Sequence, residues 1–229
     1  DFAGSTLVHA CGGSAALAGV IVLGSRQGRF GAKGEKKSLV PFAASSIPLV
    51  TLGTFLLWFG WFGFNGFSQL AMGTFDDVNA INKIAVNTHL AGAAGTVAGA
   101  AITRLLGGKT DVIMMLNGAL AGLVAITAEP LTPSPLAAIV IGAIGAIIMY
   151  FGTKMLENFG LDDVVGAIPV HMFAGIFGTL VVPFTNGDTS FGTQFVGTIS
   201  VVLFSFVLSY IAFIALKQTT GLRISKAAE

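Results

Sequence analysis

Two of the three histidines in this 229-residue sequence share a spacing pattern that suits proton chemistry. His9 follows Asp1 by eight residues, and His171 follows Asp163 by the same eight residues. An imidazole can donate a hydrogen bond from one ring nitrogen and accept one at the other. Two neighbouring imidazoles can therefore line up a small polar molecule and pass a proton. In a dry environment both rings stay neutral, because burial disfavours the charged form, so the pair would hold a permanent cation poorly.

The match between the two segments extends beyond the Asp–His spacing. When the segments are aligned at their aspartates, three more pairs coincide: Gly4 with Gly166, Val8 with Val170, and Gly13 with Gly175. The two segments are expected to cross a membrane in opposite directions, which is typical of an inverted-topology repeat with a site near the midplane. We expect ring nitrogens of His9 and His171 to lie within hydrogen-bond reach, about 2.7–3.2 Å. The alternative is a purely structural pair whose hydrogen bonds are made to backbone groups.

The third histidine, His89, has no counterpart in the repeat and is predicted to make an ordinary interhelical contact.

The elements that position these residues are predicted to be membrane helices. Hydrophobic residues make up 54% of the chain and charged residues only 10%, against about 25% charged in a soluble domain. A bilayer crossing needs about 20 apolar residues. Such stretches lie at 4–24, 41–67, 84–106, 112–128, 136–153, 164–184 and 192–216. The sequence therefore predicts an all-α integral membrane protein, a multi-span helical bundle with an inverted repeat. This composition excludes a nucleic-acid binder and an ordinary soluble enzyme.

The basic residues predict the orientation of the spans. Of the 12 Lys and Arg residues, all but Lys83 fall on one side of the predicted spans, and that side is the cytoplasmic one by the positive-inside rule. We therefore expect Asp1 outside and the C-terminus in the cytoplasm, in a multi-pass protein of the plasma or inner membrane. Residues 1–218 are predicted to form the transmembrane region, and 219–229 the start of a cytoplasmic tail.

Other kinds of site find little support in the sequence. The single Cys11 excludes a disulfide framework, and the few scattered histidines and carboxylates predict no metal site. No cofactor motif is found. An intramembrane enzyme with Asp and His as orienter and base is an alternative, but no Ser or Cys nucleophile is paired with either histidine. Gly95–Gly99 and Gly118–Gly122 have helix-packing spacing, which predicts close backbone contact between helices.

Several motifs in order along the chain resemble the ammonium transporters (Amt, Mep and Rh proteins), and the Amt branch more than the Rh branch. They are Asp1-Phe2-Ala3-Gly4…Val8-His9, Trp58-Phe59-Gly60-Trp61-Phe62-Gly63-Phe64-Asn65, Asn117-Gly118-Ala119-Leu120-Ala121-Gly122-Leu123-Val124-Ala125-Ile126-Thr127, Asp162-Asp163…Val170-His171 and Thr220-Gly221-Leu222-Arg223. The resemblance covers the whole chain. It implies an eleven-helix fold of two inverted five-helix repeats and a long last helix. This chain looks like helices five to eleven, the C-terminal part of a longer protein with about seven transmembrane helices.

The resemblance also implies roles for individual residues. His9 and His171 match the twin-His pair of the pore, and Phe64 matches the inner phenylalanine of the outer gate. Trp61 matches a tryptophan beside the pore, and Ser68 matches the serine of the outer recruitment site. Asp1 matches the buried carboxylate that supports the cation site, and Asp163 is its repeat counterpart. The chain departs from the family pattern at Phe67, Met172 and Phe173.

The resemblance implies selective uptake of ammonium, with methylammonium as an analogue and no enzymatic reaction. The cation would be recruited outside and would lose its proton near Phe64. Neutral ammonia would then cross between the imidazoles, and the proton would follow along His9 and His171. The alternative is an ammonium sensor of the same fold that signals through a cytoplasmic domain or partner.

The resemblance further implies a homotrimer embedded in lipid, with one pore per subunit and a PII-type regulatory protein on the cytoplasmic face. The loop Ser25–Ser38 carries five basic residues and one acidic residue: Arg26, Arg29, Lys33, Lys36, Lys37 and Glu35. This loop is expected either to attract an acidic partner or to serve only as the topology signal.

Overall fold

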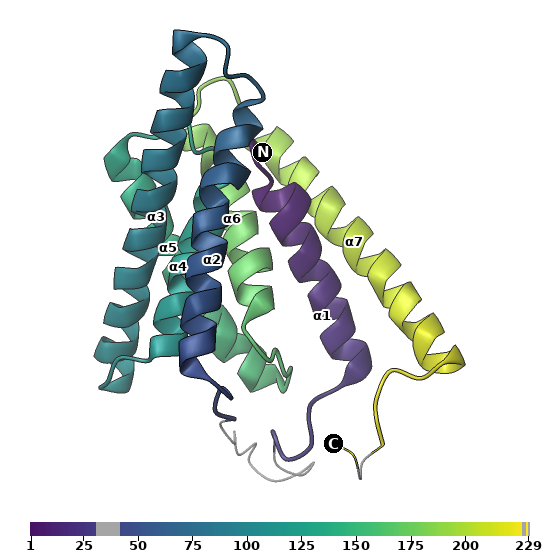
Figure 1. The fold of residues 1–229 in the computed structure, drawn as a ribbon. Coiled ribbons are helices and arrows are strands. Elements are labelled where there is room, and N and C mark those ends of the chain that lie inside the picture. Colours follow the sequence, from purple (N-terminus) through teal and green to yellow (C-terminus); the bar gives the residue numbers. More distant parts are fainter. Residues whose placement is uncertain (31–41, 226–227, 229) are drawn as a thin grey trace.

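Seven α-helices make up most of the chain in a computed structural model that describes residues 1–30, 42–225 and 228 (Figure 1). The α-helices are α1 (Cys11–Leu23), α2 (Ile47–Gly66), α3 (Phe75–Gly107), α4 (Val112–Ile126), α5 (Pro135–Phe159), α6 (Ala174–Val181) and α7 (Phe191–Thr219). Two π-helical turns, η1 (Ser5–Ala10) and η3 (Ile168–Phe173), lead into α1 and α6, and two 3-10 turns, η2 (Phe67–Gln69) and η4 (Val182–Phe184), follow α2 and α6. The predicted all-helical class is confirmed.

Every predicted span contains a helix of the structure. Within the residues that the structure describes, five apolar helical segments are long enough to cross a bilayer: Ser5–Leu23, Ile47–Gln69, Phe75–Gly107, Pro135–Phe159 and Phe191–Thr219. Two further apolar helices, Val112–Ile126 and Ile168–Phe184, are shorter. The arrangement is that of a membrane protein with several crossings.

The starts of the second and third spans differ most from those predicted by hydropathy, because polar caps rather than apolar residues start the helices. The third span was expected from residue 84, but α3 begins at Phe75, where Thr74 and Asp77 form a reciprocal capping box. The second span was expected from residue 41, which lies outside the described residues, and α2 begins at Ile47. The Ser46 hydroxyl oxygen accepts a hydrogen bond from the amide of Leu49, in the first turn of α2, at 3.4 Å.

Glycines bring α3, α4 and α5 to backbone distance, as the sequence predicts. A Cβ added to Gly118 would lie 2.5 Å from the carbonyl oxygen of Gly95, and one added to Gly99 would lie 2.9 Å from that of Met114. On α5, a Cβ on Gly142 would collide with the backbone of Ala91. These three helices therefore form a tight unit in which only glycine fits at the crossings.

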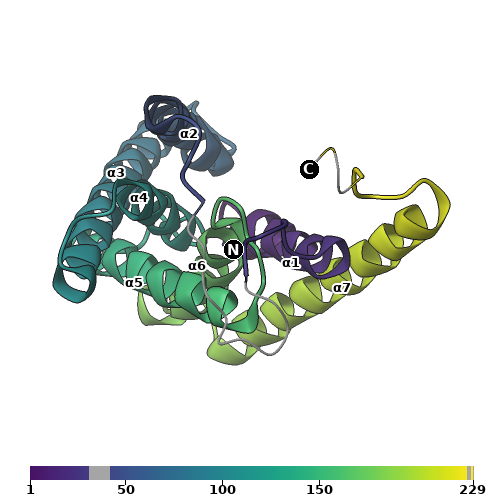
Figure 2. The ribbon, with the colours of Figure 1, turned by 90° about the horizontal axis from the view of Figure 1, so that it is seen from below.

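The helices that carry the two π turns run in opposite directions. Figure 1 shows α1 running from the N-terminal end of the bundle toward the end that carries the C-terminus, while α6 runs the other way. Seen along the bundle in Figure 2, α6 lies between α1 and the unit of α3, α4 and α5. The turn η3 packs against both α1 and α5. The opposite directions agree with the predicted inverted repeat.

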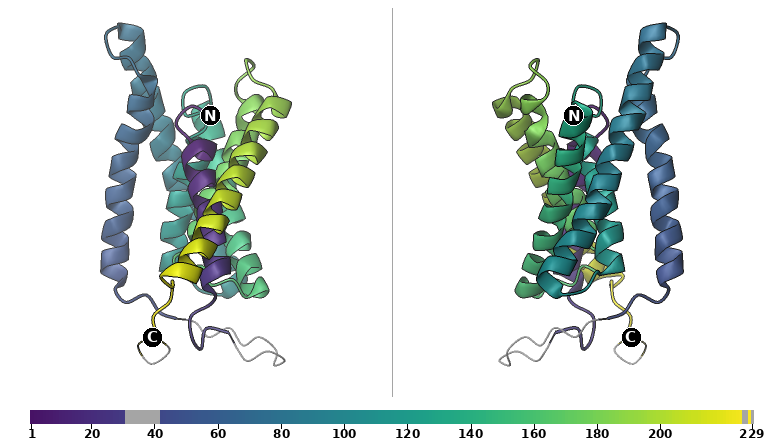
Figure 3. Two further views of the ribbon diagram at one scale, coloured as in Figure 1. Left: turned by 90° about the vertical axis from the view of Figure 1, so that its right-hand side faces the viewer. Right: turned by 90° about the vertical axis from the view of Figure 1, so that its left-hand side faces the viewer.

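The outer helices α2 and α7 lie on different sides of the bundle. α7 runs beside α1, and α2 turns into α3 at the end that carries the N-terminus (Figures 1 and 3). At the other end of the bundle, two basic side chains bind carbonyls at the C-terminal end of α1. Lys217 Nζ donates to the Val22 carbonyl at 2.8 Å, and Arg223 donates to the Leu23 and Ser25 carbonyls at 3.2 and 2.7 Å. Basic residues suit the free carbonyls of a helix end.

Candidate functional site

The imidazoles of His9 and His171 meet inside the bundle. Their Nδ1 atoms are 3.1 Å apart, and their ring centroids are 5.2 Å apart with an angle of 21° between the planes. The distance lies within the range that the Asp–His repeat predicts. One of the two Nδ1 atoms must carry the hydrogen, so the rings take different tautomers when both are neutral.

Both histidines lie in π-helical turns, which widen a helix and occur frequently at functional sites. In the first turn the His9 amide donates to the Gly4 carbonyl at 3.0 Å, five residues back. Each turn is preceded by a glycine with positive φ, Gly4 at 110° and Gly166 at 78°. Glycine is favoured there because residues with a Cβ rarely adopt this backbone conformation. The match of Gly4 with Gly166 in the sequence therefore has a conformational cause.

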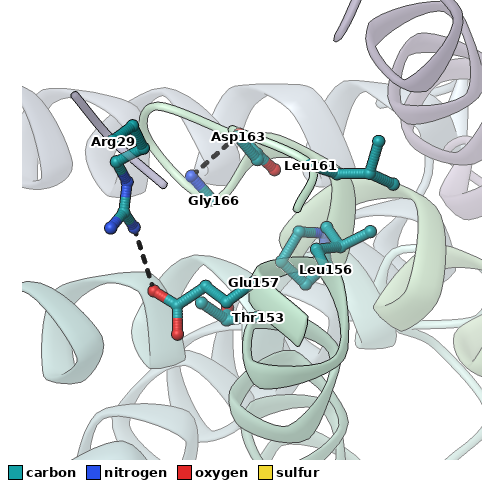
Figure 4. Close-up of a pocket in the computed structure, with 8 residues that line it drawn as sticks. Arg29, Thr153, Leu156, Glu157, Leu161, Asp163 and Gly166 are labelled. Atoms are coloured by element: carbon teal, nitrogen blue, oxygen red, sulfur yellow. Dashed lines mark hydrogen bonds and ion pairs between the residues drawn. The ribbon is translucent and has the colours of Figure 1, made fainter. Parts of the chain in front are cut away.

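Asp1 and Asp163 bind the free amides at the start of the two π turns. Asp1 Oδ2 accepts hydrogen bonds from the amides of Thr6 at 3.1 Å and Leu7 at 2.8 Å. Asp163 accepts three, from Gly166 and Ala167 at 3.0 Å each and from Ile168 at 2.7 Å. The bond between Asp163 and Gly166 is drawn in Figure 4. Both carboxylates thus hold the turns that carry the imidazoles.

The two segments cross at a pair of glycines related by the same repeat. A Cβ on Gly13 would lie 2.5 Å from the amide nitrogen of Met172, the residue after His171. A Cβ on Gly175 would lie 3.2 Å from the amide nitrogen of Ala10, the residue after His9, and would collide with the Ser5 carbonyl. The close crossing explains why the matched glycines accompany the matched histidines.

Aromatic rings from α2 cover the His9 side of the pair. Trp61 stacks on His9 with centroids 5.1 Å apart and planes 17° apart, and Phe64 lies 5.7 Å from His9 at 49°. The indole of Trp61 is fixed because its Nε1 donates to Thr127 Oγ1 at 2.8 Å. Thr127 was not among the predicted site residues. Thr127 closes the motif Asn117–Thr127 noted in the sequence, but nothing in that motif indicated a bond to Trp61.

Ser68 lies one helical turn beyond Phe64, in η2. Its Oγ donates to the Phe64 carbonyl at 2.8 Å, which leaves the oxygen lone pairs to accept a further donor. The structure thus brings His9, His171, Trp61 and Phe64 together and ties Ser68 to them through the backbone of Phe64.

His89 lies apart from this group and makes the predicted interhelical contact, with its ring 5.4 Å from that of Trp58 and 6.2 Å from that of Phe62.

A cavity of about 340 Å³ adjoins the histidine pair. It is lined by Val8, His9, Gly12, Gly13, Ala167 and His171. Apart from the imidazoles, these residues are apolar or lack a side chain. A molecule in the cavity would meet hydrogen-bonding groups mainly at the two rings, which suits a small neutral polar molecule better than an ion.

A network of ion pairs lies at the end of the bundle toward the C-terminus. Arg26 binds Asp162 with Nε–Oδ2 and Nη2–Oδ1 distances of 2.7 and 2.8 Å, and Arg29 lies 3.2 Å from Glu157. The hydrogen bond from Arg26 holds the pKa of Asp162 below its usual range, although burial of the carboxyl acts in the other direction. Two of the five basic residues in the loop Ser25–Ser38 therefore pair with acidic residues of their own chain. Lys33, Lys36, Lys37 and Glu35 lie outside the described residues.

Beside this network lies a much smaller cavity, of about 20 Å³, shown in Figure 4. Arg29, Glu157 and Asp163 are among the residues that line it. The volume is close to that needed by one water molecule. It is therefore a structural cavity beside the cap of η3 and too small for an organic ligand.

The whole chain is similar to known proteins. A model described as the Ammonium Transporter Family matches residues 1–229. The chain is 40% identical over 249 residues to the ammonium transporter Amt2 of Archaeoglobus fulgidus, with 100% of this chain and 52% of that protein covered. It is also 40% identical over 233 residues to a putative ammonium transporter of Synechocystis sp., again with 100% and 52% covered.

Solved structures show the same fold. A structure titled Sensor Amt Protein superposes with a TM-score of 0.90 at 34% identity, over 98% of this chain and 56% of the other. Mep2 of Candida albicans gives a TM-score of 0.85 at 26% identity, over 99% of this chain and 53% of the other. The chain thus spans about half the length of the relatives that it matches.

Proposed function

This chain belongs to the ammonium transporter family, and we propose that its twin imidazoles lie on a path by which ammonium nitrogen crosses a cell membrane. The observation that carries the proposal is the 3.1 Å contact between the Nδ1 atoms of His9 and His171 beside a largely apolar cavity. Methylammonium is the expected analogue.

The first step is recruitment of the cation on the side of Ser68. The Ser68 oxygen can accept a hydrogen bond from an ammonium N–H, and the rings of Phe64 and Trp61, 6.1 Å apart, can attract the charge. Such cation–π attraction contributes on the order of 1–2 kcal/mol. Transfer of a bare cation into an apolar interior costs several kcal/mol. The cation therefore stops at the aromatic rings unless it loses its charge.

The second step is loss of a proton near Phe64, after which neutral ammonia passes along the imidazoles. The pair supports this step because its rings offer both a donor and an acceptor to a small polar molecule. The proton follows along His9 and His171. Potassium has no proton to lose, so ions of similar size are discriminated by chemistry. Asp1 and Asp163 contribute indirectly, because they fix the π turns that carry the rings.

The surroundings of the site form part of the proposal. The positive-inside rule supports a cytoplasmic C-terminus, with Asp1 outside. A homotrimer with one pore per subunit follows from the family, as does a PII-type partner on the cytoplasmic face. Because Arg26 and Arg29 already bind Asp162 and Glu157, attraction of an acidic partner would depend on Lys33, Lys36 and Lys37.

The test is uptake by the full-length protein in proteoliposomes, with radiolabelled methylammonium and with ammonium against potassium. The wild type is expected to carry ammonium and methylammonium and to exclude potassium. The variant His9→Ala is expected to lose that discrimination, while the matched variant His89→Ala keeps it. Unchanged discrimination in His9→Ala would contradict the proposed proton-loss step.

A second candidate function is an ammonium sensor, favoured by the similarity to the structure titled Sensor Amt Protein. In that case ammonium would bind at the same aromatic rings without measurable flux. Saturable binding of ammonium by the full-length protein, together with absence of uptake in the same vesicles, would favour the sensor.

A further inference from the structure

Three threonine hydroxyls from different helices meet beside the turn that carries His9. Thr6 Oγ1 in η1 lies 2.7 Å from Thr179 Oγ1 in α6 and 3.2 Å from Thr198 Oγ1 in α7. The three residues are only 3%, 2% and 4% exposed, so water does not compete for these bonds. We name Thr6, Thr179 and Thr198 the hydroxyl cluster. No step of the proposed transport uses it.

The hydroxyl cluster holds the π turn of His9 in addition to the bonds made by Asp1. Thr6 is bonded through its backbone amide to Asp1 and through its side chain to Thr179 and Thr198. The neighbouring Ser5 Oγ donates to the Val124 carbonyl of α4 at 2.6 Å. Directional bonds to α4, α6 and α7 therefore fix both the position and the rotation of this turn.

The second π turn has no such hydroxyls. In the repeat alignment Ile168 stands at the place of Thr6, and Ala167 at the place of Ser5. Ile168 is fully buried, so apolar packing takes the place of the hydroxyl bonds in this turn, in addition to the three backbone bonds to Asp163. Packing contacts are not directional, whereas a hydrogen bond weakens steeply as its angle departs from linear. The two turns match in backbone and differ in how they are held.

We propose that Thr6, through Thr179 and Thr198, is a positioning residue that sets His9 against His171. The inference rests on the proposed function, because it assigns the cluster a role in conduction along the imidazoles. The Nδ1 atoms lie 3.1 Å apart, near the upper limit for a hydrogen bond, so a shift of a few tenths of an ångström would break the contact. A turn free to rotate would allow such a shift.

The first experiment measures ammonium uptake by the full-length protein with Thr6→Val and Thr6→Ser. Valine has nearly the shape of threonine without the hydroxyl, and serine keeps the hydroxyl. Thr6→Val is expected to lower the maximal uptake rate about tenfold, since misplacement of a reacting group by about 1 Å can cost about a hundredfold and the expected shift is smaller. The apparent KM should change little, since recruitment at Ser68 and Phe64 is untouched. Thr6→Ser is expected to restore most of the rate.

A matched control separates positioning from general loss of a buried hydroxyl. Thr54 is 5% exposed, and its hydroxyl donates to the Val50 carbonyl of its own helix at 3.0 Å. Thr54→Val is expected to leave uptake unchanged. Equal losses in Thr6→Val, Thr6→Ser and Thr54→Val would overturn the proposal, because they would indicate destabilisation without any specific role of the cluster.

A second readout does not depend on transport. With 15N-labelled histidine in the full-length protein, the hydrogen shared by the two Nδ1 atoms gives a coupled, strongly downfield NMR signal. We expect this signal to disappear in Thr6→Val and to persist in Thr6→Ser and Thr54→Val. A folded Thr6→Val protein with the wild-type signal and rate would overturn the proposal. If the wild type failed to carry ammonium, the proposed function would fail, while the NMR signal would still decide the positioning role.

Two further variants carry the test if Thr6→Val does not fold. Thr179→Val removes the 2.7 Å contact and leaves the 3.2 Å one, and Thr198→Val does the reverse. We expect the larger loss of rate and of the shared-hydrogen signal in Thr179→Val, because the shorter bond is the stronger one. Wild-type rates and signals in both variants would contradict the proposal.

Discussion

Gly13 lies directly against the backbone of Met172, so that a Cβ added to Gly13 would come within 2.5 Å of the Met172 amide nitrogen. The repeat places the reciprocal contact between Gly175 and Ala10. His9 and His171 each precede one of the contacted residues by a single position. The close crossing of the two backbones therefore brings the imidazoles within reach of each other.

Substitution of either crossing glycine is expected to separate the rings. Gly13→Ala should destabilise the protein by about 1–3 kcal/mol, as overpacking does, and should sharply lower ammonium uptake. The matched variant Gly53→Ala, on α2, adds a methyl group where no atom lies within 4 Å and should be neutral. Thermal unfolding in detergent and uptake in proteoliposomes check both effects. A Gly13→Ala protein with normal uptake would show that the crossing does not set the ring contact.

The bond between Trp61 and Thr127 predicts a second effect. Thr127→Val leaves the buried indole N–H without its 2.8 Å partner, which should cost about 1–3 kcal/mol. Thr127→Ser keeps the acceptor and should behave like the wild type. Thermal unfolding of the full-length variants in detergent measures the difference. Equal stability of the Val and Ser variants would contradict the assigned bond.

The two aspartate caps are expected to differ in strength. Asp163 accepts three backbone hydrogen bonds and Asp1 accepts two. Asparagine retains one acceptor oxygen and no charge. Asp163→Asn should therefore lower the free energy of unfolding by roughly 1–3 kcal/mol, and Asp1→Asn should lower it by less. Hydrogen exchange at the amides of Gly166, Ala167 and Ile168 should accelerate in Asp163→Asn. Unchanged protection of these amides would refute the capping role.

The ion pair of Arg26 and Asp162 predicts a pH dependence of stability. The folded-state pKa of Asp162 lies below its ordinary value of 3.8, so its stabilising effect is complete above that pH. The effect is lost as the pH falls through the folded-state pKa. The stability difference between wild type and Asp162→Asn should therefore stay constant from neutral pH down to about 5 and shrink below about 4. A difference that persists unchanged to the lowest accessible pH would argue against the ion pair.

Local patterns in the sequence predicted the histidine pair better than the residues that hold the site in place. The histidine pair was predictable because the same Asp–His spacing occurs in two segments of opposite direction. The start of α3 at Phe75 was missed because a capping box extends the helix beyond its apolar part. Thr127 and the partners of Thr6 lie far along the chain from the residues they hold, and no spacing rule links them. The ion pairs of Arg26 and Arg29 could not be predicted either, because the sequence of a basic loop does not indicate whether its charges are paired.

The two imidazoles are similarly placed, but only one of them donates the hydrogen that lies between their Nδ1 atoms. The ring that donates from Nδ1 has a bare Nε2, and the ring that accepts carries its hydrogen on Nε2. The pair therefore has a polarity, with an acceptor at one end and a donor at the other; in the described part of the chain, His9 Nε2 is buried and meets no partner. Passage of one proton along the pair reverses this polarity. A second proton can follow from the same side only after the rings have reset, so a hydrogen-bonded histidine pair transmits one proton per reset.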